Sequence, residues 1–112
     1  MLRLRLDSIW SPNLVPEDTG VPHDIHHCQL YMKTKISDKE GHFKVFTFQV
    51  CTPSTLSEFE SGNFLKYVLV LEKFDWQAIQ KRIKGLVEDC EDCTNWNEAI
   101  TALASSLEYK GE

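Results

Sequence analysis

Hydrophobic and polar residues alternate along the first half of the chain, which is the pattern of β-strands with one buried face. Leucines alternate with charged residues from Leu2 to Asp7. The same period of two returns from Asp24 to Ile36 and from Phe43 to Cys51. The segment Ser37–Gly41 is predicted to be a turn between these two strands, because its glycine can adopt a positive φ. The pattern therefore predicts one strand followed by a hairpin.

Turn-forming residues interrupt this alternation. Ser11–Pro22 contains three prolines and a glycine, which predicts a long irregular loop of the kind that is often functional or mobile. Pro53 is predicted to end the third strand, since proline cannot donate a ladder hydrogen bond. A short helical turn, capped by its first or second residue, is expected over Ser54–Phe59, and another turn at Ser61–Asn63.

The second half begins with a nearly continuous apolar run and then changes to a helical period. The run from Lys66 to Phe74 predicts a fourth strand, central in the sheet because apolar residues would cover both of its faces. Asp75 is expected to cap the helix that follows. A second helix is predicted from Trp96, where Asn95 and Glu98 have the spacing of a capping box. The predicted buried faces are Trp76, Ile79, Ile83, Leu86 or Val87 and Cys90 in the first helix, and Trp96, Ala99 or Ile100, Leu103 and Leu107 in the second.

Four strands followed by two helices predict an α+β fold. We expect a four-stranded, mainly antiparallel sheet with a C-terminal helical hairpin packed on one face. The 112 residues suit a single domain over residues 1–112. Residues 110–112 are expected to be frayed. The oligomeric state is left open, because unpaired strand edges would allow two copies to pair.

The uneven distribution of charge gives the first indication of function. The net charge is −5. Residues 1–56 contain six basic and six acidic residues, whereas residues 57–112 contain six basic and eleven acidic ones. An acidic protein is unsuited to direct contact with nucleic acid, whose phosphates are bound by Lys and Arg. The imbalance favours a basic partner, and acidity that serves solubility alone is the other interpretation.

Acidic residues gather near the predicted end of the first helix. Four carboxylates between residues 88 and 92 lie where the helix dipole disfavours negative charge, at a cost of about 0.3–1 kcal/mol per exposed group. The cluster is therefore either a surface presented to a basic partner or a solvated turn. The predicted partner-binding residues are Glu88, Asp89, Glu91, Asp92, Glu98 and, in the proline-rich loop, Glu17 and Asp18.

Cys90 and Cys93 form a C-x-x-C pair, which admits a zinc- or thiol-dependent regulatory role as an alternative. Zinc requires four ligands, and the sequence has no second pair of this kind. The acidic residues between the two cysteines would raise a thiol pKa, which disfavours redox chemistry. The simpler interpretation is that Cys90 packs on the helix face and Cys93 lies in the following turn. Cys28 and Cys51 fit their strands as small core residues.

No catalytic motif is evident. The sequence lacks a G-x-S-x-G nucleophile elbow and a glycine-rich phosphate loop. His26 and Cys28 would share one strand face, but two ligands do not make a metal site. We therefore expect a protein that is not an enzyme and uses no metal or cofactor.

The N-terminus and the apolar runs bear on location. Arginines interrupt the leucines at the N-terminus, so this segment is not a signal peptide. The longest apolar run, Tyr67–Leu71, is far shorter than the ~20 residues of a membrane helix. A cytoplasmic protein without membrane contact is expected.

Four motifs follow one another along almost the whole chain. They are Ser11-Pro12 after the first strand, the F-x-F-x-V-C-T-P-x-x-L stretch from Phe46 to Leu56, the run Val68–Ile79, and Asn95–Ala99 at the start of the last helix. In this order they resemble the immunity protein 8 family of bacterial polymorphic toxin systems.

The resemblance implies that the protein binds the C-terminal domain of a cognate toxin and blocks it, in competition between bacteria. Such toxins are commonly nucleases, which are basic around the active site, so an acidic inhibitor can occupy the place of the nucleic acid. Immunity surfaces vary with the toxin, and the resemblance therefore transfers no contact residues. An adaptor of an unrelated assembly is the third interpretation.

Overall fold

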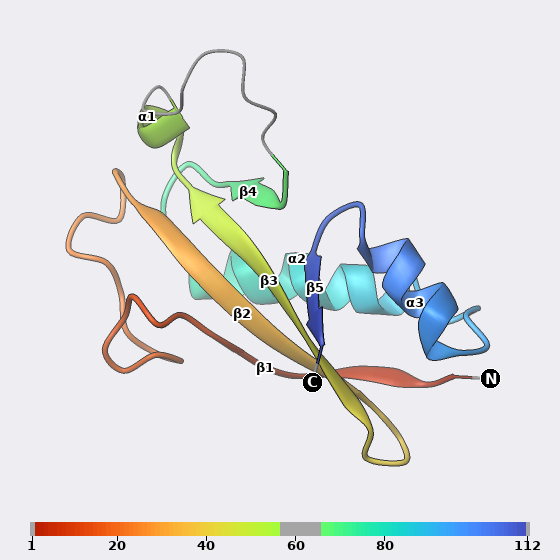
Figure 1. Cartoon of the computed structure of the whole chain (residues 1–112). Helices are drawn as coiled ribbons and strands as arrows, with labels where there is room; N and C mark the ends of the chain where they lie inside the picture. The colour runs from red at the N-terminus through yellow and green to blue at the C-terminus, as the bar shows by residue number, and fades with distance from the viewer. Residues whose placement is uncertain (1, 57–65, 112) are drawn as a thin grey trace.

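The computed structural model describes residues 2–56 and 66–111, and it shows a mixed sheet with its two longer helices on one side (Figure 1). This confirms the predicted α+β fold. In chain order the elements are β1 (Leu4–Trp10), β2 (Gln29–Asp38), β3 (Phe43–Cys51), α1 (Pro53–Leu56), β4 (Val68–Val70), α2 (Trp76–Glu88), α3 (Trp96–Leu103) and β5 (Glu108–Gly111).

Several predicted boundaries need correction. β1 begins two residues later than predicted, and β2 begins at Gln29 instead of Asp24. The residues before β2 form a turn, because the Asp24 carboxylate accepts a hydrogen bond from the His26 amide at 2.9 Å. α1 begins at Pro53, with Thr52 between it and the strand that this proline was predicted to end, so the predicted caps Ser54 and Thr55 lie inside the helix. The end of the predicted helical turn and the turn at 61–63 lie outside the described residues.

β3 is the central strand of the sheet. β2 pairs with it antiparallel along the whole hairpin, and β1 pairs antiparallel with the other side of β2. The second edge of β3 is shared by two short strands: β4 runs parallel beside Gln49–Cys51, and β5 runs antiparallel beside Val45–Thr47. Phe48 therefore lies at the junction between β4 and β5.

The prediction of a central fourth strand is wrong. β4 is a three-residue strand at the sheet edge. Tyr67, just before it, has a φ of 60°, a left-handed backbone that costs a non-glycine residue about 1–2 kcal/mol. The apolar run reflects contact with the core from the edge, because Leu69 and Leu71 pack against the core whereas Val70 is 46% exposed.

The prediction of a frayed tail is wrong for Lys110 and Gly111, which belong to β5, and residue 112 lies outside the described residues. α3 ends at Leu103, and the chain then turns and adds β5 to the sheet. The Tyr109 ring lies 5.4 Å from the Phe46 ring, and the Thr47 hydroxyl donates to the Glu108 carboxylate at 3.2 Å. These contacts hold the C-terminal segment beside a strand from the first half of the chain.

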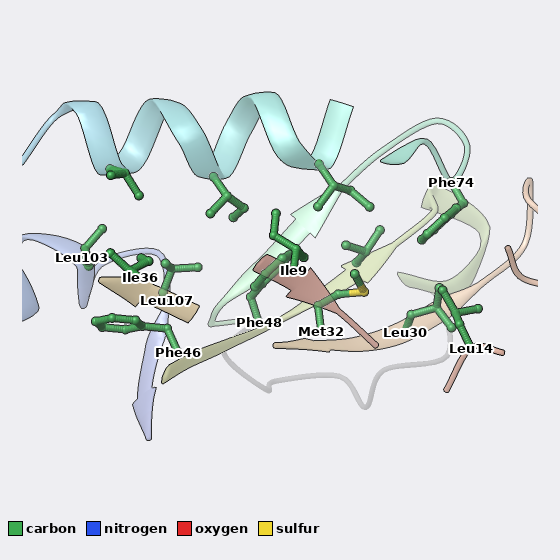
Figure 2. Close-up of a cluster of buried hydrophobic side chains, with 14 of the residues drawn as sticks. Ile9, Leu14, Leu30, Met32, Ile36, Phe46, Phe48, Phe74, Leu103 and Leu107 are labelled. Carbon is green, nitrogen blue, oxygen red and sulfur yellow. The ribbon is translucent and has the colours of Figure 1, made fainter. Parts of the chain in front are cut away.

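The hydrophobic core lies between the sheet and the helices. Figure 2 shows these side chains in the space between α2 and the strands. The predicted inward positions of α2 are confirmed at Ile79 and Ile83. Leu107 is buried as predicted, but it reaches the core from the turn after α3. Other buried core residues are Met32, Ile36, Phe46, Phe48 and Val50 from the sheet, and Ala99 and Leu103 from α3.

Local hydrogen bonds begin both long helices where the sequence predicts. The Asp75 carboxylate accepts from the amides of Gln77 and Ala78, at the N-terminus of α2. The Asn95 side chain accepts from the Glu98 amide at 2.9 Å, and the Glu98 carboxylate accepts in return from the Thr94 amide at 2.9 Å. This reciprocal arrangement is a capping box shifted by one residue.

Hydrogen bonds also fix the proline-rich loop between β1 and β2. Beyond the end of β1, the buried Ser11 hydroxyl donates to the Tyr31 carbonyl at 2.6 Å, and the Asn13 side chain accepts from the Tyr31 amide at 2.9 Å. The two side chains thus satisfy the backbone groups of Tyr31, in the part of β2 that extends past β1. Further along, the Trp76 indole donates to the Gly20 carbonyl at 2.7 Å, which anchors the loop to the start of α2.

Candidate functional site

The acidic cluster predicted near the end of the first helix is exposed. Glu88 is the last residue of α2, Asp89 is its C-cap, and the other two acids, Glu91 and Asp92, lie in the turn before α3. The last turn of α2 contains no basic residue. Within residues 2–56 and 66–111, none of these four carboxylates forms an ion pair or a hydrogen bond. They are therefore available to a partner.

The fold brings two further acids to this end of the molecule. The Trp96 indole of α3 donates to the Asp38 carboxylate at 3.1 Å, which joins α3 to the β2–β3 hairpin. The Leu2 amide donates to the Cys93 carbonyl at 3.1 Å, so the N-terminal segment lies beside the turn before α3. Glu40 is exposed in the same hairpin. We call this surface the acidic end and define it as Asp38, Glu40, Glu88, Asp89, Glu91, Asp92 and Glu98.

The acidic end is negative overall although it contains cations. Arg3 lines two shallow clefts there, one with Glu88 and Glu91 and the other with Asp38 and Glu40. Other cations nearby are Lys39, in the second cleft, Lys84, which lines a neighbouring cleft with Glu88, and Lys44, whose ammonium lies 6.0 Å from the centre of the Trp96 ring. The seven acids of the acidic end thus outnumber these four bases.

Asp38 anchors the acidic end. Burial by itself would raise the pKa of this carboxyl, but hydrogen bonds from the Trp96 indole and from the amides of Glu40 and His42 outweigh burial, and the pKa lies below its ordinary value. The carboxylate therefore stays charged at neutral pH. Sequence reasoning missed Asp38 and Glu40, because no local pattern connects the hairpin to an indole 58 residues away.

Glu98 differs from the other predicted residues. Its carboxylate already accepts the Thr94 amide in the capping arrangement, so part of its hydrogen-bonding capacity serves the start of α3. The side chain is still exposed and adds negative charge to the acidic end. We regard Glu98 chiefly as a structural residue that also contributes to the electrostatic field.

Glu17 and Asp18 lie at the opposite end of α2. Their loop is anchored to Trp76, at the N-terminus of the 13-residue helix, whereas the acidic end begins at its C-terminus, about 20 Å away. Both side chains are exposed, and two valines near them in the loop are exposed as well, Val15 by 94% and Val21 by 64%. The structure thus separates the predicted partner-binding residues into two groups.

The cysteines occupy the positions expected of packing residues. Cys90 is 1% exposed, and burial, reinforced by the neighbouring Cys93 and Asp89, raises the pKa of its thiol to about 11. A neutral thiol is a poor nucleophile and metal ligand at pH 7. Cys93 lies half-buried in the turn between the helices, while Cys28 and Cys51 are buried, as predicted. The described residues contain no group of three or more His, Cys, Asp or Glu side chains that could hold a metal ion.

In the part of the chain that the structure describes, no helix is both long and apolar enough to cross a membrane. No curated protein and no solved structure matches the chain. Residues 11–112, from the end of β1 to the C-terminus, match the sequence model of the family described as Immunity protein 8. The chain therefore belongs to the immunity protein 8 family.

Proposed function

We propose that the protein binds the C-terminal domain of a cognate nuclease toxin through its acidic end and blocks the toxin's nucleic-acid site without catalysis of its own. Membership of the immunity protein family supports a toxin partner. The observation that carries the choice of surface is the set of four exposed, unpaired carboxylates at the end of α2. A nuclease places basic residues where it holds phosphates, so its active site is complementary to this surface.

Long-range electrostatics suits this task. An acidic patch steers a basic partner during diffusion and raises the association rate, and salt weakens the effect over a Debye length of about 8 Å at physiological ionic strength. Once bound, the carboxylates occupy positions that substrate phosphates would need. The proposed inhibition therefore requires no mobile part or reactive group. Asp75 and Asn95 cap the starts of α2 and α3, the helices on either side of the acidic turn.

The thiol-dependent alternative has less support. The raised pKa of Cys90 keeps that thiol protonated, and from the turn after α2 the thiol donates a hydrogen bond to the Leu86 carbonyl at 3.6 Å. The same side chain contributes to the hydrophobic core. These observations favour a packing role.

Calorimetric titration with the toxin domain encoded immediately upstream of the gene tests the proposal. Glu91→Lys/Asp92→Lys and Glu17→Lys/Asp18→Lys make the same change in net charge at the two ends of α2. We expect tight one-to-one binding by the wild type that weakens with salt, a clear loss of affinity in the first variant and little change in the second. A loss confined to the second variant would place the contact on the loop, and no binding by the wild type would refute the toxin pairing.

A further inference from the structure

The second charged feature of the molecule is a cleft at the sheet edge, beside the junction of β4 and β5. It has a volume of about 270 Å³ and is lined by residues of β3, β4, α2 and the turn that leads into β5. Three buried core residues, Phe48, Ile83 and Leu107, form its apolar floor. We call it the cationic cleft; its polar rim consists of Lys66, Tyr67, Arg82, Ser105 and Ser106.

The charge of the cleft is opposite to that of the whole chain. Among the described residues, the two charged side chains that line it, Lys66 and Arg82, are both cations, and no carboxylate does. In the described part of the chain neither cation has an ion pair or a hydrogen bond, and both side chains are exposed. A recess whose described charged residues are all cations is unexpected in a protein with a net charge of −5.

The rim also offers uncharged donors. Among the described residues, the Tyr67 and Ser106 hydroxyls have no hydrogen-bond partner, whereas the Ser105 hydroxyl donates to the Ala102 carbonyl at 3.4 Å. Cations and hydroxyls above an apolar floor suit an oxyanion on an apolar stem. The volume falls just below the ~300–1,000 Å³ of ordinary small-molecule pockets, so the cleft suits a group the size of one side chain.

We propose that the cationic cleft receives an acidic side chain of the partner toxin. The Arg82 guanidinium offers a planar fork that pairs with a carboxylate through two hydrogen bonds, and the Lys66 ammonium adds a second charge. The aliphatic stem of the bound side chain rests on Phe48 and Leu107. The cleft thereby supplies a specific contact, which the diffuse field of the acidic end does not. This inference rests on the proposed function for the identity of the partner.

A backbone hydrogen bond holds Tyr67 at the rim of the cleft. Tyr67 holds its left-handed conformation while its carbonyl accepts a hydrogen bond from the Gln49 amide at 2.7 Å. Non-glycine residues in this conformation concentrate at sites that contact ligands. Leu86 lines the cleft and Glu88 begins the acidic end, so both surfaces include residues from the C-terminal half of α2.

The first test uses sodium glutarate, which carries a carboxylate at each end of a short aliphatic stem, as the probe. The full-length ¹⁵N-labelled protein is titrated by NMR with glutarate, with neutral glutaramide and with inorganic phosphate, each at matched ionic strength. We expect saturable shifts from glutarate at the amides of Tyr67, Val68 and Ser106, and no such shifts from glutaramide. Shifts from phosphate without shifts from glutarate, or no shifts from either anion, would overturn the assignment.

Variants with matched charge locate the site. Arg82→Gln is expected to abolish the glutarate shifts, whereas Lys84→Gln, which removes a cation from the same helix outside the cleft, is expected to leave them unchanged. Equal losses in both variants would indicate a general effect of charge and would overturn the site. A thermal melt of each variant checks that the fold is retained.

The second test measures binding to the toxin domain. Arg82→Gln should weaken binding of the toxin by about tenfold to a hundredfold, because hydrogen bonds to charged groups contribute about 1.5–3 kcal/mol. Lys84→Gln, which removes a cation beside Glu88, should not weaken it. Tight binding unaffected by Arg82→Gln would overturn the cleft proposal and leave the proposed function intact. If the toxin does not bind at all while the glutarate shifts appear, the proposed function fails and the carboxylate site stands.

Discussion

The acidic end and the cationic cleft differ in how the chain builds them. Most of the acidic end comes from one short stretch, residues 88–98, and its side chains point into solvent from a turn between helices. The cleft takes its lining from four separate parts of the chain, and its cations matter because the fold places them over an apolar floor. The acidic end attracts a basic partner over a long range but offers no recess for a side chain. The cleft offers such a recess but has only two charges to attract a partner. In the proposed complex, the acidic end attracts the toxin over a distance, and the cleft recognises one of its side chains.

Charge reversal at the acidic end should give the largest effect on toxin binding. Replacing Glu88, Asp89, Glu91 and Asp92 by Lys is expected to slow association at low salt by about tenfold to a thousandfold, because steering becomes repulsion. Stopped-flow association rates at several salt concentrations measure this. The dependence on salt should flatten or reverse in the variant, and unchanged rates would remove this surface from the interface.

The left-handed backbone at the cleft should affect stability by about 1–2 kcal/mol. Tyr67→Gly and Tyr67→Ala both remove the ring, so the difference between them isolates the backbone. We expect the glycine variant to be the more stable by about 1–2 kcal/mol, because glycine adopts positive φ without steric cost. Denaturant unfolding of both variants gives the comparison. An alanine variant as stable as the glycine variant would show that this backbone conformation is not strained.

The Asp38 anchor of the acidic end should appear in the pH dependence of stability. Its pKa in the folded protein lies below the ordinary value of 3.8, so its contribution is complete above that value and is lost as the pH falls through the lowered pKa. Asp38→Asn should therefore be less stable than the wild type at pH 7, and the difference should shrink below about pH 4. Glu40→Gln, in the same hairpin, serves as the control. A difference that does not change with pH would contradict the anchoring role of the charge.

Thiol reactivity should give the smallest effect and distinguishes packing from chemistry. Among the four cysteines, the half-buried Cys93 should react with a thiol reagent first at pH 8, while Cys90, with its pKa near 11, stays protected until the protein unfolds. Cys93→Ser should remove the fast phase. Rapid labelling of Cys90 in the folded protein would return the thiol-dependent alternative to consideration.

The features that the sequence predicted correctly depend on neighbours in the chain. Asp75 and Asn95 cap helices through amides two or three residues away, and the β2–β3 hairpin closes over a short turn. The helical period likewise predicts the inward faces. Interactions of this range are encoded in spacing and residue type, so a pattern along the chain is sufficient to detect them.

The features that the sequence missed depend on distant segments. β5 joins β3 through residues such as Thr47 and Glu108, which are 61 positions apart, and no local pattern indicates that pairing. The continuous apolar run at β4 suggested a central strand because apolarity alone does not distinguish a buried strand from an edge that touches the core. The candidate site follows the same division: the acids of residues 88–92 were predictable, whereas Asp38, Glu40 and the cleft were not.

Amide hydrogen exchange of the protein, alone and in complex with its toxin domain, tests the central claim most directly. We predict increased protection in the complex over residues 88–98 and in the β2–β3 hairpin, with the loop around Glu17 and Asp18 unchanged. Protection confined to that loop, with the acidic end exchanging as in the free protein, would contradict the proposal that the acidic end binds the toxin.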